Sequence, residues 1–230
     1  MAARSTARSS GRRTATKKRA KAASRRSATR KAATRKTSRK KSTARGAARR
    51  SPAQRMARRV GGNPLAVPAQ EMLEKLQQER PSGDATELLE QDHREVESMF
   101  EEFEGLDDDS EKQELARKIC TALTVHAEVE ESVFYPRARK AIDETDLLDE
   151  AQVEHNSAKL LIAEILSMRP RDKLFDAKVK VLGEYIKHHV QEEENELFPK
   201  LRDSEMDLDA VGKKMMQQKM NIVSGLAGRR

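Results

Sequence analysis

Apolar residues recur at helical spacing in four successive segments between residues 85 and 201. In the first segment they are Leu89, Val96, Phe100 and Phe103, separated by seven, four and three residues as on one face of an amphipathic helix. Similar stripes run through residues 111–140, 146–168 and 172–201, and the alternation typical of β-strands is missing throughout. The pattern therefore predicts four long helices and an all-α fold.

Turn and capping residues separate these segments. Asp84 or Thr86 can cap the first helix, Gly105 with the acidic turn 107–110 ends it, and Pro170 separates the third helix from the fourth. Long helices joined by short turns lie antiparallel to their neighbours, which predicts an up-down-up-down four-helix bundle. The pattern also allows a short helix over residues 69–80 and a fifth helix, packed outside the bundle, over residues 206–220.

Charge divides the chain near residue 70. Residues 1–70 hold 23 of the 46 Lys and Arg and no Asp or Glu, which leaves 23 basic and 38 acidic residues in the remainder. The formal net charge of +8 is thus the sum of a strongly basic part and an acidic one. We predict a disordered basic tail over residues 1–65, a linker over 66–84, a bundle over 85–203, and a C-terminal helix with a short tail over 204–230.

The basic tail lacks the residues needed for a core. Its large apolar residues before Leu65 are Met1, Met56 and Val60, too few to offset the entropy of an ordered chain. Many positive charges without an anion suit a phosphate backbone, while the absence of aromatic residues removes stacking platforms for bases. The composition resembles the Ala-, Lys- and Arg-rich tails of linker histones and bacterial nucleoid proteins.

We therefore expect residues 1–60 to bind nucleic acid without sequence specificity. Two other interpretations are a transit peptide, which the lack of Leu and Phe disfavours, and a solvating tail without a partner. The chain has no apolar run approaching the roughly 20 residues that cross a bilayer, so no membrane partner is expected. Its single cysteine, Cys120, excludes an intramolecular disulfide framework and is interpreted as a core residue. The expected location is the cytoplasm, in association with the nucleoid.

Polar residues interrupt the apolar stripes at matching places. Each predicted helix carries one histidine on its inner face, and two helices add a glutamate one turn later. Buried carboxylates are costly unless a cation neutralises them, and imidazoles supply nitrogen ligands for such a cation. The histidine spacings of the two halves, 33 and 34 residues, indicate a pseudo-two-fold repeat and a dinuclear metal centre. The predicted metal ligands are His93, His126, Glu130, His155, His189 and Glu193.

The stretches DHREVESMFEEF, HAEVEESVFYP, EHNSAKLL and HHVQEEENELFP resemble the hemerythrin-like (HHE cation-binding) family. The resemblance covers about residues 85–201, and its most specific part is the pair of His-x-x-x-Glu motifs that end in an aromatic residue and proline. It implies a non-haem di-iron site, two iron ions with an oxo or hydroxo bridge, held by these same six residues in a four-helix bundle.

The chain departs from the oxygen-carrying members of that family at two positions. Lys159 stands where they have a second histidine on the third helix, and their final carboxylate is an Asp five residues after its histidine, whereas Glu193 follows His189 by four. The missing imidazole leaves one iron with a position for water or another ligand. Candidates for that ligand are Glu97, Tyr185 and His188, whose default interpretations are a solvated acid, a core phenol and a surface residue.

The neighbouring acidic residues Glu131, Glu192 and Glu194 are expected on a charged outer face. Together the two halves predict an iron-bearing bundle, held beside DNA by its tail, that handles iron, oxygen species including peroxide, or nitric oxide. The open iron position also allows catalysis with peroxide or nitric oxide, for which no catalytic residue is assigned. The alternative is a metal- or redox-sensing protein that compacts or regulates DNA without catalysis. No nucleophile triad, phosphate loop or nucleotide fingerprint indicates another enzyme class.

Deleting residues 1–60 is expected to abolish retardation of duplex DNA at low salt, because it removes 23 positive charges that displace condensed counterions. An electrophoretic mobility assay over a salt series measures this effect. Unchanged binding by the shortened chain would contradict the prediction.

Overall fold

The computed structural model describes residues 62–79, 81–143 and 145–228. The predictions for the basic tail up to residue 61 lie outside these residues. Every regular element in the described part is a helix, which confirms the all-α class. Among the described residues, no helix combines the length and apolar character that crossing a membrane would need.

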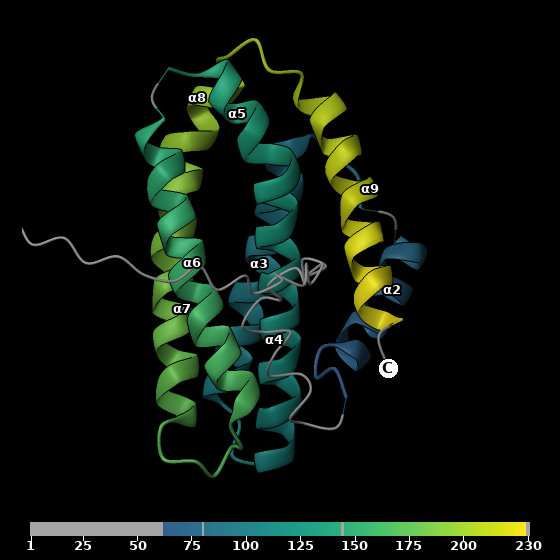
Figure 1. Cartoon of the computed structure of the whole chain (residues 1–230), viewed down its shortest axis with the longest axis vertical. Helices are drawn as coiled ribbons and strands as arrows, with labels where there is room; N and C mark the ends of the chain where they lie inside the picture. The colour runs from purple at the N-terminus through teal and green to yellow at the C-terminus, as the bar shows by residue number, and fades with distance from the viewer. Residues whose placement is uncertain (1–61, 80, 144, 229–230) are drawn as a thin grey trace, which may run out of the picture. The chain divides into compact units, whose positions relative to one another are not determined.

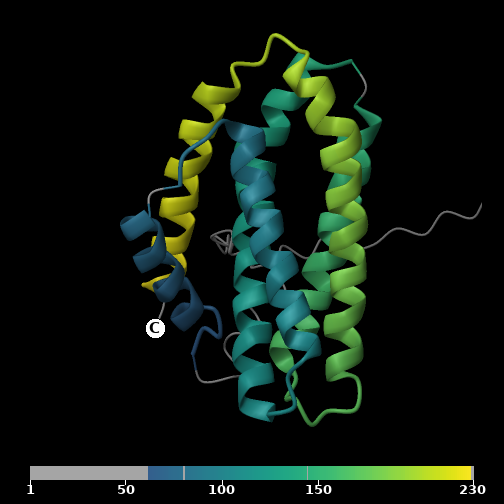
Figure 2. The ribbon, with the colours of Figure 1, turned by 180° about the vertical axis from the view of Figure 1, so that it is seen from behind.

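Four long helices lie side by side along the longest axis of the described part, as Figures 1 and 2 show from opposite sides. Two of them continue beyond a short π-helical turn into a further helix, so that the predicted second and fourth helices are each built from three pieces. The first half comprises α3 (Ala85–Glu104), α4 (Asp109–Val129), η1 (Glu130–Phe134) and α5 (Tyr135–Ala141). The second half comprises α6 (Asp146–Ser167), α7 (Phe175–Glu192), η2 (Glu193–Leu197) and α8 (Phe198–Arg202).

Capping explains where the first two helices begin. The Asp84 side chain accepts hydrogen bonds from the backbone N–H groups of Thr86 and Glu87, and the Glu87 side chain accepts one from the backbone of Asp84. This capping box settles the choice between Asp84 and Thr86. The Asp108 side chain caps α4 by accepting hydrogen bonds from the backbone N–H groups of Ser110 and Glu111, so that helix begins two residues before the predicted start at 111.

The two π-helical turns differ from the continuous helices that periodicity predicts. Each begins at a predicted ligand glutamate and ends where an aromatic residue precedes Pro136 or Pro199. Proline has no N–H to donate to the carbonyl four residues earlier, so the regular ladder cannot continue through it. The N–H groups of Tyr135 and Phe198 instead donate five residues back, to the carbonyls of Glu130 and Glu193. Such bulges are frequent at functional sites.

Two further helices, α2 (Ala66–Glu79) and α9 (Leu208–Ala227), pack against each other beside α3 and α4 (Figure 1). Each extends beyond its predicted range, α2 at its start and α9 at its end. Pro68 lies in the first turn of α2, where a missing N–H costs nothing. Buried residues of both helices belong to the core cluster that also contains Leu89 and Val129. Residues of the predicted linker therefore contribute to the core.

The core consists of two apolar clusters with a polar layer between them. One contains Leu89 and Phe134, and the other contains Val96, Phe103 and Cys120. Cys120 is buried, as predicted, and burial raises the pKa of its thiol to about 12. Along α3 the buried His93 falls between Leu89 and Val96, which places the polar layer where the two clusters meet.

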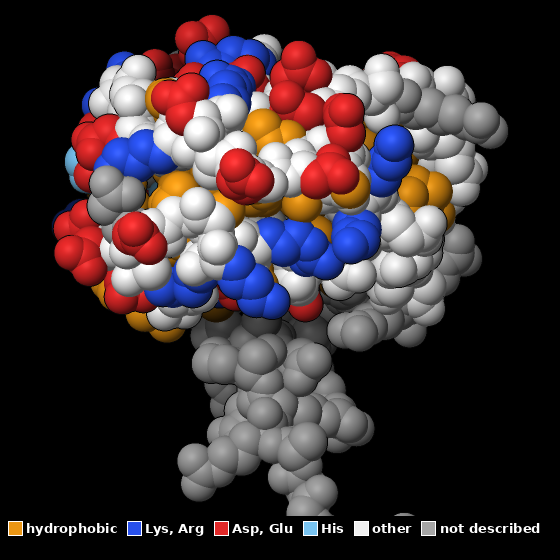
Figure 3. Space-filling model, turned by 90° about the horizontal axis from the view of Figure 1, so that it is seen from above, with side chains coloured by type: hydrophobic (Ala, Val, Ile, Leu, Met, Phe, Trp, Pro, Cys, Tyr) orange, Lys and Arg blue, Asp and Glu red, His pale blue; other side chains and the backbone are white. Residues whose placement is uncertain are grey.

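Helices α5 and α8 lie at one end of the described part, which Figure 3 shows from above. Lys and Arg side chains alternate with Asp and Glu across this end. Both helices carry basic residues in their last turn, among them Arg139 and Lys200. This face thus combines charges of both signs, in contrast to the uniformly basic sequence of residues 1–60.

Replacing Gly212 by Ala is expected to loosen α9 from α3. A Cβ atom at Gly212 would lie 3.0 Å from backbone atoms of Gly83, Asp84 and Ala85, which cannot move independently. We expect the free energy of unfolding to fall by about 1 kcal/mol or more, measured by urea denaturation.

The matched control is Gly225→Ala on the same helix, where a Cβ atom meets nothing within 4 Å. Helix propensity should make this variant more stable by up to about 1 kcal/mol. Equal effects of the two substitutions would contradict close packing at Gly212.

Candidate metal centre

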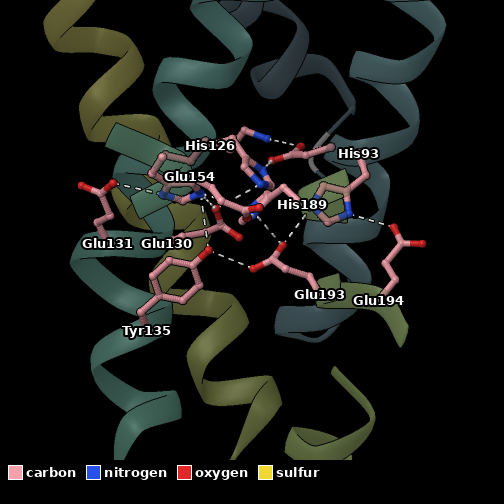
Figure 4. A network of polar contacts seen from close by, with 12 residues as sticks. His93, His126, Glu130, Glu131, Tyr135, Glu154, His189, Glu193 and Glu194 are labelled. Atoms are coloured by element: carbon pink, nitrogen blue, oxygen red, sulfur yellow. Dashed lines mark hydrogen bonds and ion pairs between the residues drawn. The ribbon is translucent and has the colours of Figure 1, made fainter. Parts of the chain in front are cut away.

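The six residues predicted as ligands come together in the polar layer of the bundle (Figure 4). One histidine projects from each of α3, α4, α6 and α7, and the two glutamates project from the first positions of η1 and η2. All six are buried, with at most 7% of any residue's surface exposed. The periodicity of the sequence is thus sufficient to bring these residues onto one interior layer.

Their donor atoms form two groups that share one carboxylate. His93, His126, Glu130 and Glu193 offer ligand atoms within 4.8 Å of one another, and so do Glu130, His155 and His189. Glu193 also reaches toward both groups, because its Oε2 lies 3.4 Å from His93 Nε2 and 3.7 Å from His189 Nε2. Two ions could therefore be held side by side with carboxylates between them.

The inward atoms of the first group lack hydrogen-bond partners. These unpartnered atoms include the Nε2 atoms of His93 and His126, both oxygens of Glu130, and Oε2 of Glu193. His126 Nε2 and Glu130 Oε2 are only 3.1 Å apart, within ion-pair distance but not in hydrogen-bonding geometry, so both atoms face the same space. Buried polar atoms are nearly always paired, and a buried carboxylate is costly without a cation or donors. The residues therefore fit a metal ion at this point.

The second group leads to the same conclusion. The Nε2 atoms of His155 and His189 face each other at 3.1 Å. When the Nδ1 atom of each ring donates its proton to a carboxylate, both Nε2 atoms present lone pairs that repel each other. A metal ion between or beside them removes this repulsion, as does a proton on His155 when no metal is bound.

Four outer carboxylates lie at the far side of the histidine rings; three are hydrogen-bonded to the Nδ1 atom, and Asp92 lies at ion-pair distance from His126. Such contacts orient a ligand histidine and select the tautomer whose Nε2 is free to bind a metal. The Nδ1-to-carboxylate distances are 2.8 Å for His93 to Glu194, 3.5 Å for His126 to Asp92, 3.0 Å for His155 to Glu131 and 2.8 Å for His189 to Glu154.

These outer carboxylates obey the two-fold repeat. The acidic residue directly before the first histidine of each half, Asp92 or Glu154, contacts the second histidine of the same half. The acidic residue directly after each ligand glutamate, Glu131 or Glu194, contacts the first histidine of the other half. The outer contacts therefore join the two halves as well as orienting the rings.

Glu131 and Glu194 were expected on a charged outer face, but the structure turns both carboxylates inward. Each is about a quarter exposed, but each points its carboxylate at a buried histidine (Figure 4). The signal in the sequence was the pair of consecutive glutamates, since the π-helical turn directs both toward the interior layer. Glu192 does lie at the surface, where it pairs with the exposed His188 at 3.2 Å.

The three candidates for a further ligand lie outside both groups. Glu97 pairs with Arg94 at 2.8 Å, and Tyr185 is exposed rather than a core phenol. His188 is exposed and forms a separate surface group with Glu154 and Glu192.

A tyrosine that periodicity did not single out lies at the centre instead. The buried Tyr135 hydroxyl donates to Glu193 Oε1 at 2.9 Å and lies 3.4 Å from His155 Nε2. Its counterpart in the repeat is Phe198, whose ring stacks on that of His93 with a centroid distance of 6.0 Å. One half of the layer therefore carries a phenol and the other does not. The aromatic-proline motif was the available signal, but it does not specify which aromatic residue supplies a polar group.

Lys159 stabilises an outer carboxylate. Its Nζ donates to both oxygens of Glu131 at 2.5 and 2.6 Å, and Glu131 in turn contacts His155. A protonated amine cannot ligate a metal, so the position of the absent histidine contributes positive charge to the outer shell.

Electrostatics shows that the layer requires positive charge. Burial by itself lowers the pKa of His126, but the carboxylates of Glu130 and Asp92 raise it to about 10. Burial likewise opposes protonation of His155, whereas Glu130 and Glu131 raise its pKa to about 9. In the absence of metal, protons therefore supply the missing charge at neutral pH.

The acidic groups of the layer shift so that the carboxylates stay charged and the phenol stays neutral. Although burial favours their neutral forms, neighbouring cations hold the pKa of Glu130 well below its usual range and lower that of Glu131 to about 2. Burial and the charges of Glu130 and Glu193 raise the pKa of Tyr135 well above its usual value. Tyr135 therefore remains a neutral hydrogen-bond donor.

A small cavity of about 20 Å³ adjoins the four histidines. Such a space holds about one water-sized molecule. Its walls are mostly apolar, with Val96, Leu123 and Ile162 among them, and Lys159 and Asp92 add charged groups. The layer thus has room beside the ligands for a species of only a few atoms.

Binding of a divalent ion to the metal-free protein at pH 7 is expected to release about one proton per ion. His126 and His155, with pKa values near 10 and 9, are protonated at that pH, and only neutral imidazoles bind metal. Protons compete more strongly as pH falls, so the apparent affinity should rise about tenfold per pH unit from pH 7 toward 9. Calorimetry in buffers of different ionisation enthalpy counts the protons.

The control is Glu128→Gln, which removes an exposed carboxylate outside both inner groups and should leave the proton count unchanged. A count near zero in the unaltered protein would contradict the charge balance described above.

Comparison with known proteins agrees with this geometry. Residues 84–201 match the family model described as hemerythrin HHE cation binding domain. A relative named DNA nickase, from Nostoc sp. (strain PCC 7120 / SAG 25.82 / UTEX 2576), is 33% identical over 118 residues, which is 51% of this chain and 33% of that protein. No solved structure matches the chain. Because the family model covers half of the chain and includes all six clustered residues, the chain belongs to the hemerythrin HHE cation-binding domain family.

Proposed function

We propose that the bundle binds two iron ions, one in each group of donor atoms, with Glu130 shared between them. The observation that carries this proposal is the convergence of buried imidazole and carboxylate donor atoms on two points, the first of which is lined by atoms without hydrogen-bond partners. Four imidazoles and two carboxylates suit iron among the transition metals, and bundles commonly hold paired iron ions with such ligands. When bound, iron supplies redox chemistry and a Lewis acid.

The proposal includes an up-down-up-down order of the four long helices. The connections from α3 to α4 and from α6 to α7 span only residues 105–108 and 168–174. Such short connections favour antiparallel neighbours. This order would also place the two halves of the repeat around a common pseudo-two-fold axis.

The substrate or ligand of this centre is proposed to be small. All six ligands are buried and the adjoining cavity holds about one water-sized molecule, which suits oxygen, peroxide or nitric oxide. A duplex cannot reach donor atoms buried in this way, so DNA would be a location for the protein rather than its substrate. Lys159 lines the cavity and could donate a proton or hydrogen bond there.

The basic tail is proposed to keep the bundle beside nucleic acid in the cytoplasm. Its charge supports this, and the name of the Nostoc relative, DNA nickase, indicates a protein that acts on DNA. An iron centre kept there could bind or consume iron and oxidants before they damage DNA, a role in oxidative stress.

A second candidate is a metal- or redox-sensing protein that compacts or regulates DNA without catalysis. The strongly basic sequence of residues 1–60 favours it, because such a segment can neutralise the DNA backbone without any catalytic step. Steady turnover of peroxide by the iron-loaded protein would exclude this candidate, and a metal-dependent change in DNA compaction without turnover would support it.

The metal proposal is tested with Glu130→Gln, a substitution of similar shape that removes the shared charge. We expect elemental analysis to find two iron ions per unaltered chain after anaerobic loading and a loss of both, by more than tenfold in affinity, in the variant. The shared carboxylate belongs to both groups, so both ions should be affected together.

Glu128→Gln is the matched control, the same exchange at an exposed glutamate two residues before Glu130 and outside both inner groups. It should retain both ions. An unaltered chain that takes up no iron, or a Glu130→Gln variant that binds as the unaltered chain does, would overturn the proposal.

A further inference from the structure

A largely buried ion pair joins the C-terminal helix α9 to the candidate metal centre. Lys219 on α9 places its Nζ 2.5 Å from Oδ1 of Asp92 on α3, across 127 residues of sequence. The other oxygen of Asp92, Oδ2, lies 3.5 Å from Nδ1 of His126. A hydrogen-bonded ion pair thus links α9 to Asp92, and Asp92 lies at ion-pair distance, without a hydrogen bond, from a predicted ligand.

Lys219 differs from the basic side chains that contact the other outer carboxylates. Lys159, Arg94 and His188 contact the other three, and their side chains are 40%, 56% and 63% exposed. The Lys219 side chain is only 13% exposed. The three other basic residues lie within residues 84–201, which the family model covers, whereas Lys219 lies beyond them.

The packing of α9 keeps Lys219 in place. Met215 and Val223, four residues before and after it, are buried, so Lys219 lies on the inward stripe of the helix. The close approach at Gly212 brings α9 against the start of α3. A lysine with so little exposed surface is costly unless an anion pairs with it, and Asp92 is that anion.

The surroundings of Asp92 explain why its orientation needs support. A cavity of about 210 Å³ opens beside it among α2, α3 and α9, and both Asp92 and Lys219 line this space. Without the ammonium group, the carboxylate could turn into the cavity and bind water there. His126 would then lose the group that holds its Nδ1 side.

We propose that Lys219 is a positioning residue of the metal centre, which directs Asp92 toward His126 and so aims the Nε2 atom of that histidine at an ion. The inference rests on the proposed function, because it requires a metal at His126. It extends that function by making α9, outside the family domain, part of the metal-binding unit. By linkage, bound metal at His126 stabilises the docking of α9 by the same free energy by which docked α9 strengthens metal binding.

The test uses Co²⁺ as a spectroscopic probe in the full chain. Titration in competition with a chelator should show two ions in the unaltered protein. In Lys219→Met, which keeps the apolar stem but removes the charge, one ion should bind about tenfold more weakly and with an altered absorption spectrum. The second ion should keep its affinity, and Lys219→Arg should recover part of the loss at the first.

Lys213→Met is the matched control, an exposed lysine on the same helix that should leave both affinities unchanged. Thermal unfolding of each metal-free variant reports any general loss of stability. In a His155→Ala background, which leaves the group containing His93 and His126 intact, Lys219→Met should weaken the remaining ion.

Several outcomes would overturn the inference. Co²⁺ affinities and spectra of Lys219→Met equal to those of the unaltered chain would show that Lys219 does not position His126. Equal weakening of both ions, in proportion to lost stability, would show a packing role alone. An unaltered chain that binds no Co²⁺ and no iron would instead remove the proposed function itself.

Discussion

Two carboxylates buried inside a helical bundle are the constraint on which the centre of this structure depends. Glu130 and Glu193 are almost inaccessible to solvent, and only Glu193 receives a hydrogen bond from a neutral donor, Tyr135. Positive charge must therefore be present in the same layer. Protons on His126 and His155 provide it when no metal is bound, and a pair of cations would provide it more completely. The raised imidazole pKa values and the metal proposal thus have one electrostatic origin.

The same constraint explains the alternation of charge outward from the centre. The four inner histidines contact Asp92, Glu131, Glu154 and Glu194, and these carboxylates in turn contact basic side chains such as Lys159 and Lys219. Each layer of side chains balances the charge of the layer inside it and limits the rotation of its side chains. Since the outer carboxylates of one half reach histidines of the other, the two halves are mutually dependent. Lys219 extends this dependence to a helix outside the family domain.

The backbone contributes through its two π-helical turns. Each begins four residues after an inner histidine, and Pro136 or Pro199 prevents the regular hydrogen-bond ladder from continuing beyond it. Consecutive glutamates there approach one histidine of the other half at both of its nitrogens, as Glu130 and Glu131 do at His155. The asymmetry between Tyr135 and Phe198 then distinguishes the two otherwise similar half-sites, because one has a phenol beside its histidine and the other a flat apolar ring.

The sequence by itself determined the all-α class, the core position of Cys120 and the meeting of six residues in one layer, because helical periodicity assigns a face to each residue. It could not assign Glu131, Glu194, Tyr135 or Lys219, since their roles depend on which neighbouring helix each side chain meets. Local periodicity also missed the π-helical turns, where proline overrides the ladder. Only tertiary packing decides such contacts, because paired residues such as Asp92 and Lys219 are 127 residues apart and nothing in local spacing links them.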